Sequence, residues 1–216
     1  MKNKLRIMIV LVGIVSIGAS QAALLDRGAG LIYDTELDIT WLQNANFSGD
    51  VFGWDVAINW AANFSYYDSV RDTTWTDWRL PTTLQTDATC LSQPTGISYT
   101  GCTGSELGHL FYIELGGVAG HSLEDTHNAN FSLFSNIQNG AFWSGTAYHS
   151  NTNLAWFFSM HDGSQGATGT NFANYLSAWA VRDGDVAVVP EPGAWALFSI
   201  GLAFTAIKIG RQNRKF

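Results

Sequence analysis

Five histidines are the first residues in this sequence that could do chemistry, because imidazole binds transition metals and transfers protons near neutral pH. They are His109, His121, His127, His149 and His161. None has a second histidine four residues away, as in the H-E-x-x-H helix of zinc enzymes, and all but His109 fall in apparent loops. We therefore predict no transition-metal site from the sequence.

Three carboxylates, Asp34, Glu36 and Asp38, alternate along the chain. On a strand they would share one face and could hold a cation, but a turn between two strands is the favoured interpretation. The sequence around them also lacks the EF-hand pattern. We therefore expect no resident cofactor, and calcium stays as the alternative that these carboxylates leave open.

Nucleophilic catalysis has one candidate, Ser144, which lies in a Trp-Ser-Gly sequence. It lacks the upstream glycine of the G-x-S-x-G motif and falls in a predicted strand rather than at a strand-to-helix turn. The segment 23–189 contains no lysine, which excludes Schiff-base, lysine-base and P-loop chemistry there. We predict no catalytic residue, and an exported enzyme with an unrecognised active site stays as the alternative function.

The two cysteines, Cys90 and Cys102, lie 12 residues apart in a segment rich in Gly, Thr, Ser and Pro. In an oxidising compartment an even number of cysteines at such a spacing predicts a disulfide. A bond closing this loop would contribute about 3 kcal/mol in the chain-entropy account. A redox or metal-binding pair would need C-x-x-C spacing or adjacent ligands, which this segment lacks.

Charge excludes one large class of partner. The segment 23–189 has four arginines against 17 acidic residues, a net charge of −13. Nucleic-acid binding depends on Lys and Arg, so we expect no nucleic-acid partner. One of the four cations, Arg79, lies between the apolar residues Trp78 and Leu80, and we predict that it forms a half-buried structural ion pair.

The elements that must position these residues are short strands and helices. Two apolar runs around a polar turn, 30–34 and 39–42, predict a hairpin. Helical spacing of apolar residues predicts a helix over 53–65, and Thr103 followed by Glu106 has the form of a capping box that opens a second helix. Aromatic strands between Gly-, Asn- and Asp-rich turns follow at 142–144, 155–158 and 178–181. The pattern predicts an α+β fold, a single compact domain with two helices and small antiparallel sheets.

The N-terminus has the parts of a secretory signal peptide. Three basic residues lie among the first six, an apolar run covers 7–19, and small residues occupy positions 20 and 22. As a helix the run reaches about 20 Å, short of the ~30 Å of a hydrocarbon core, which argues against a retained anchor. We predict that residues 1–22 are removed by a cut between Ala22 and Ala23.

The C-terminus has a second hydrophobic segment. Pro190-Glu191-Pro192 precedes an apolar run over 193–209, and four of the last nine residues are basic. The run reaches about 25 Å as a helix, a short transmembrane span whose basic end would stay on the cytoplasmic side. The alternative, a buried core helix, is disfavoured because these basic residues would have to be buried with it.

The order Pro-Glu-Pro, short hydrophobic helix and terminal basic cluster resembles the PEP-CTERM sorting signal of Gram-negative bacteria that make exopolysaccharide. The resemblance implies processing by an exosortase near Pro190, Glu191 and Pro192. It also implies signal peptidase and exosortase as partners during maturation. The membrane contact through the C-terminal helix would be transient, in the inner membrane, before release to the cell envelope, the outer surface or the extracellular matrix.

The central segment resembles a bacterial domain of unknown function that is related to the C-terminal domain of the Lcl collagen-like adhesin. The matching pieces are Gly30-Leu31-Ile32-Tyr33-Asp34, Thr40-Trp41-Leu42, Trp60-Ala61-Ala62, Asp77-Trp78-Arg79-Leu80-Pro81-Thr82, Phe142-Trp143-Ser144-Gly145-Thr146, Ala155-Trp156 and Ala178-Trp179-Ala180-Val181-Arg182. The resemblance implies a C-type-lectin-like, sulfatase-modifying-factor-like fold over 23–187, followed by the sorting signal at 188–216. This chain departs from the pattern by an insertion at 85–102.

These resemblances together imply a function outside the cell. We expect an exported surface or matrix protein whose domain is a non-catalytic binding or structural module. Its expected partner is exopolysaccharide or another matrix component. The copper-binding cysteines of formylglycine-generating enzymes are not matched, because the two cysteines are assigned to the disulfide.

Overall fold

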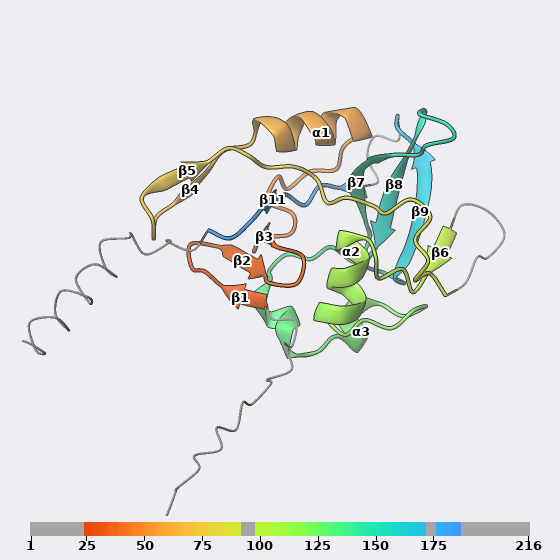
Figure 1. Ribbon diagram of the computed structural model, residues 1–216, viewed down its shortest axis with the longest axis horizontal. Helices are drawn as coiled ribbons and strands as arrows, with labels where there is room; N and C mark the ends of the chain where they lie inside the picture. The colour runs from red at the N-terminus through yellow and green to blue at the C-terminus, as the bar shows by residue number, and fades with distance from the viewer. Residues whose placement is uncertain (1–23, 92–97, 172–175, 187–216) are drawn as a thin grey trace, which may run out of the picture.

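The computed structural model describes residues 24–91, 98–171 and 176–186, which form a mixed α+β fold with few helices and small sheets (Figure 1). In the view of Figure 1 the two larger sheets lie toward opposite sides, with helix α1 above them, helix α2 between them and helix α3 below. The predicted α+β class is therefore confirmed.

The first sheet has four strands in the order β1-β2-β3-β11. They are β1 (Leu24–Asp26), β2 (Leu31–Asp34), β3 (Ile39–Leu42) and β11 (Val181–Asp183). The predicted hairpin is present as β2–β3, with Asp34 opposite Ile39. Asp34 Oδ1 accepts hydrogen bonds from the Glu36 and Leu37 amides, both at 3.0 Å, so the alternating carboxylates form a turn as expected. Strand β11 pairs with β3 and brings the two ends of the described chain together.

The second sheet has five strands in the order β10-β7-β8-β9-β6. They are β6 (Ser98–Thr100), β7 (Ala141–Ala147), β8 (Leu154–Ser159), β9 (Ser164–Gly169) and β10 (Leu176–Ser177). Strand β10 runs parallel to β7, which differs from the all-antiparallel expectation. The reason is topological, because β9 and β10 run in the same direction on opposite sides of the β7–β8 pair, so a crossover and not a hairpin joins them. A separate two-stranded ribbon joins β4 (Tyr66–Asp68) to β5 (Thr73–Trp75).

The two predicted helices are present, and a third was missed. Helix α1 covers Trp54–Asn63, while α2 covers Glu106–His109 and continues as a π-helical turn, η1 (Leu110–Glu114). The additional elements are the short helix α3 (Leu123–Thr126) and a 3₁₀ turn, η2 (Ala129–Leu133). The predicted capping box is wrong, because Ser105 occupies the N-cap of α2 and the Glu106 carboxylate binds Arg79 and the Thr82 amide instead.

Tryptophans form the centre of the core. Trp41, Trp143 and Trp179 are fully buried. The rings of Trp41 and Trp179 meet edge to face at 5.2 Å between centroids, and the Trp179 indole donates to the Leu42 carbonyl at 2.7 Å. Trp41 and Trp179 share a core cluster with Leu110 and Phe111 of η1, whereas Trp143 belongs to a second cluster with Ala57 and Ala61 of α1.

The predictions at the two ends of the chain lie outside the described residues. This applies to the signal peptide at 1–22, the Pro190-Glu191-Pro192 motif and the helix expected after it. Within the ranges that the structure describes, no helix is both long and apolar enough to cross a membrane.

Candidate binding pocket

The disulfide-bearing insertion forms one wall of a pocket. Cys90 and Cys102 lie at disulfide-bonding distance, as the sequence predicts. The Asp87 carboxylate accepts hydrogen bonds from the amides of Thr89 at 2.9 Å and Gly104 at 3.0 Å. Asp87 lies near the start of the insertion and Gly104 just after its end, so the hydrogen bond between them and the disulfide both hold the two ends of the insertion together.

Strand pairing positions the opposite wall. Strand β6, inside the insertion, pairs with β9 so that Tyr99 lies directly opposite Gln165. Opposite residues of an antiparallel pair point to the same side of the sheet. Strand β8 lies on the other edge of β9 and contributes Trp156, which pairs with Ala167. Strand β6 and the β8–β9 hairpin, which is distant from it in sequence, therefore present side chains to the same face of the sheet.

The pocket has a volume of about 320 Å³. It is lined by Leu84, Thr86, Asp87, Ala88, Cys90, Tyr99, Tyr148, His149, Trp156 and Gln165. This volume falls at the lower end of the range for small-molecule sites, roughly 300–1,000 Å³. A second cavity, of about 180 Å³, lies beside Leu123 and Met160 and has a single aromatic wall, Phe131.

Three aromatic residues line the larger pocket: Tyr99, Tyr148 and Trp156. The Trp156 ring lies 5.4 Å from the Tyr148 ring and 6.1 Å from the Tyr99 ring, measured between centroids. Such a group offers flat apolar surfaces together with polar edges. It suits a ligand that has an apolar face and polar substituents.

Two residues that line the pocket each have a buried polar atom with no hydrogen-bond partner among the described residues. They are the donor Trp156 Nε1 and the acceptor Gln165 Oε1, on side chains that are 4 % and 1 % exposed. An unpaired buried donor or acceptor costs about 1–3 kcal/mol, which a ligand or an ordered water can recover. A hydroxyl group, which can both accept and donate, matches this donor and acceptor once a side-chain movement exposes them to the pocket.

The acidic and basic side chains at the pocket are engaged in structural contacts. Asp87 binds the backbone of Thr89 and Gly104, as described above. His149 Nδ1 lies 2.9 Å from Gln85 Oε1, and the His149 amide donates to the same oxygen at 2.8 Å. Neither side chain contacts the other in a catalytic arrangement such as a nucleophile with its base.

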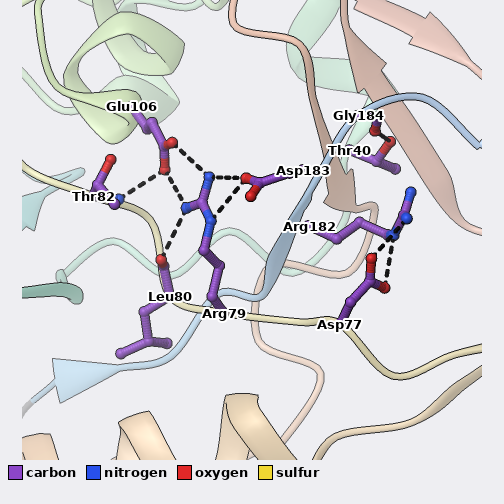
Figure 2. A network of polar contacts seen from close by, with 9 residues as sticks. All are labelled: Thr40, Asp77, Arg79, Leu80, Thr82, Glu106, Arg182, Asp183 and Gly184. Carbon is purple, nitrogen blue, oxygen red and sulfur yellow. Dashed lines mark hydrogen bonds and ion pairs between the residues drawn. The ribbon is translucent and has the colours of Figure 1, made fainter.

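Figure 2 shows the ion pairs that hold the segment before the insertion in place. Arg79 Nη1 and Nη2 each donate to one oxygen of Glu106 at 2.8 Å, and Arg79 Nε donates to Asp183 at 3.0 Å. Arg182 binds Asp77 through two hydrogen bonds of 3.0 and 2.8 Å. The predicted half-buried ion pair of Arg79 is thus present, and its role is structural.

The other residues considered from the sequence are dispersed. Ser144 is fully buried in β7, where its hydroxyl accepts from the Thr146 amide at 3.1 Å, so it is unsuited to act as a nucleophile. The ring of His127 stacks on Phe131 at 4.1 Å, and His161 Nδ1 lies 3.1 Å from Asn139. His149 reaches the pocket, whereas His109 lies in a buried polar cluster described below.

Sequence reasoning missed the pocket residues Tyr99, Trp156 and Gln165. Trp156 lies in a strand that the sequence predicted. Its neighbours in space come from the insertion and from β9, and no pattern in the sequence indicated that these two segments pair with each other. One signal of the pocket wall was present in the sequence, because the insertion contains both cysteines and a single tyrosine, Tyr99.

No protein-family model matches this chain, and no match was found among the curated proteins or the solved structures.

Proposed function

We propose that this chain is an exported, exosortase-processed protein of the cell surface or extracellular matrix of an exopolysaccharide-producing Gram-negative bacterium. Its central domain, with a C-type-lectin-like fold, acts as a non-catalytic binding module. The signal-like N-terminus and the Pro-Glu-Pro tail in the sequence support the export and processing steps. The observation that carries the binding role is the aromatic pocket with its unpaired donor and acceptor on Trp156 and Gln165.

The chemistry of the pocket favours a neutral, hydroxyl-rich ligand such as a sugar unit of a matrix polysaccharide. The partly exposed Tyr99 and Tyr148 rings, which pack on the buried Trp156, offer stacking surfaces for a sugar face. Rotation of the buried Gln165 side chain toward the pocket would let its unpaired Oε1 accept a hydrogen bond from a sugar hydroxyl. The net charge of −13 over 23–189 repels acidic polysaccharides, so neutral sugars or cation-bridged acidic ones are the expected classes.

Weak binding is sufficient for this role. A dissociation constant of 1 mM corresponds to about 4 kcal/mol, which a single stacked sugar with two hydrogen bonds can supply. In a polysaccharide matrix the sugar is repeated many times along each chain, so the local ligand concentration is high. Many weak contacts can then retain the protein through avidity.

The test is retention of the envelope-purified protein on the host's own exopolysaccharide, in calcium and then in chelator. Trp156→Phe removes the Nε1 donor and keeps an aromatic ring, so we expect binding to fall at least about tenfold, the equivalent of one hydrogen bond of ~1.4 kcal/mol. Trp60→Phe, on helix α1 and outside the pocket, is the matched control and should bind as the unmodified protein does. No retention in either condition, together with turnover of an envelope substrate, would replace this proposal by the enzyme alternative.

A further inference from the structure

A second group of polar side chains meets inside the protein, away from the aromatic pocket. It consists of Asp34 at the end of β2, His109 at the end of α2 and Glu114 at the end of η1, all of them buried. One ligand atom of each residue lies within 4.8 Å of those of the other two. His109 Nε2 is 3.4 Å from Glu114 Oε1 and 3.9 Å from the carboxylate of half-exposed Glu36. None of these residues lines either cavity described above.

The π-helical turn explains how His109 and Glu114 meet. Residues five apart on a regular α-helix point about 140° away from each other. Here the Leu115 amide donates to the Leu110 carbonyl at 2.9 Å, a five-residue closure that widens the turn. The widened turn rotates Glu114 back toward the side of the helix that holds His109. A search for histidine pairs at α-helical spacing cannot detect this arrangement.

Three atoms in the cluster have no hydrogen-bond partner among the described residues. They are Asp34 Oδ2, His109 Nε2 and Glu114 Oε1, on side chains that are 0 %, 5 % and 2 % exposed. The other oxygen of Asp34 is held by the amides of Glu36 and Leu37, which fixes the direction of the free one. Buried ionisable groups are normally paired or bound to a metal, because an unpaired one costs several kcal/mol.

The electrostatics of the cluster show an excess of negative charge. Burial raises the pKa of the Asp34 carboxyl. Burial alone would lower the pKa of His109, but its contact with Glu114 and the charges of Asp34 and Glu36 outweigh that effect and raise it. A divalent cation would displace the imidazole proton on binding and neutralise the −2 charge of the two ionised carboxylates. The cluster therefore has the geometry, the free atoms and the charge of a cation site.

We propose that Asp34, His109 and Glu114 bind one divalent first-row transition-metal ion, with Glu36 at the solvent side of the site. One imidazole nitrogen and two carboxylate oxygens are ligands that zinc, manganese and ferrous iron accept. Calcium prefers six to eight oxygen ligands and is a poor match for a site that contains an imidazole. The ion would connect the β2–β3 turn to the α2–η1 helix, two parts of the fold that are 75 residues apart in sequence.

The experiment uses the full chain, purified in mild detergent, stripped with chelator and then dialysed against zinc or calcium. We expect one zinc ion per chain by elemental analysis and a higher unfolding temperature in zinc, with no such increase in calcium, because a ligand of the folded state stabilises it. Cobalt replacing zinc should give visible absorption bands that report the ligand set. Failure of the unmodified protein to retain zinc or to gain thermal stability from it would overturn the proposal without reference to any variant.

Variants then assign the ligands. Glu114→Gln and His109→Gln keep the side-chain size and should weaken zinc binding at least about 100-fold, since even changes in the outer shell of metal sites cost 10–100-fold. His127→Gln, which changes an exposed histidine outside the cluster, is the matched control and should bind zinc normally. Unchanged affinity in folded Glu114→Gln and His109→Gln proteins would also overturn the proposal. The outcome is independent of the polysaccharide test, which addresses different residues.

Discussion

Arg79 and Glu106 form a two-point ion pair across the base of the insertion, with both Arg79 Nη atoms donating to the Glu106 carboxylate at 2.8 Å. Arg79 precedes the insertion and Glu106 begins the helix after it, so the pair sets the separation of the two ends. The pair is partly shielded from water, since the side chains are 30 % and 14 % exposed. This relationship accounts for an arginine between apolar neighbours in a domain with few cations.

Replacing Arg79 by lysine should destabilise the domain by about 2 kcal/mol, because lysine keeps the charge but cannot form the two parallel hydrogen bonds. Denaturant unfolding measures the change. Asp183→Asn is the control, because this carboxylate also binds Arg79 but is 80 % exposed, and we expect a loss of under about 1 kcal/mol. Equal losses in the two variants would show that the geometry of the Glu106 pair has no special importance.

Replacing both Cys90 and Cys102 by serine should open the insertion and abolish ligand retention while the aromatic core stays folded. Cys90 lines the pocket, whereas the tryptophan cluster around Trp179 contains neither cysteine. The expected cost is at most about 3 kcal/mol. Near-ultraviolet circular dichroism reports the core, and mass spectrometry of unreduced native protein should find no alkylatable thiol. Two free thiols in the native protein would contradict the disulfide.

The mature protein should begin at Ala23 and lack the tail that follows Pro190-Glu191-Pro192. The residues before Ala23 fit the signal-peptidase pattern, and the hydrophobic run 193–209 is a marginal span that anchors the chain only until processing. Mass spectrometry of envelope and medium fractions measures both ends. A chain that keeps Met1, or that keeps Lys215 where exosortase is active, would refute the corresponding step.

The hairpin and both longer helices could be predicted because their signals are local. The turn at 35–38 and the helical spacing around Trp54 need no knowledge of the rest of the fold. The capping box was predicted wrongly because the partner of Glu106 is a residue distant in sequence. Glu106 lies at the expected offset from Thr103, but a distant partner, Arg79, offers two charged donors and takes the carboxylate from the helix end.

The two polar sites could not be predicted because they depend on pairings between distant segments. Tyr99 reaches Gln165 through the β6–β9 pairing, which local patterns do not specify. His109 and Glu114 meet through a π-helical turn, whereas sequence rules assume α-helical spacing. Asp34 was noted as an acidic residue in a turn, yet only the tertiary structure shows that one of its oxygens points into the protein.

Gly108 is required by a close approach between α2 and the end of the insertion. A Cβ atom at this position would lie 1.8 Å from the carbonyl oxygen of Cys102, which is backbone and cannot move aside cheaply. Gly108→Ala should therefore destabilise the domain by about 3 kcal/mol. Gly140→Ala is the control, because a Cβ there meets nothing within 4 Å and should leave stability unchanged or slightly raised. A stable Gly108→Ala protein would mean that helix α2 can shift away from Cys102.

Asp68 should make the stability of the domain depend on pH in the acid range. The side chain is buried, and burial alone would raise its pKa, but hydrogen bonds from Arg71, Trp75 and the amides of Val70 and Arg71 lower it below its ordinary value. A lowered pKa means that unfolding takes up protons. The contribution of Asp68 is therefore complete above its unfolded pKa, near 4, and is lost as the pH falls through the lower folded value.

Asp68→Asn isolates this contribution. At neutral pH we expect a loss of about 3 kcal/mol, because the substitution leaves the Arg71 guanidinium, whose side chain is 10 % exposed, without its carboxylate partner. The difference between native and variant proteins should shrink as the pH is lowered below about 4, where the unfolded chain takes up the proton, until Asp68 is protonated in the folded protein as well. Asp72→Asn, in the same ribbon and bound to the exposed Tyr67 hydroxyl, is the control and should cost under about 1 kcal/mol. A constant difference between the Asp68→Asn and native proteins from pH 7 to pH 2 would rule out titration of Asp68 as the cause.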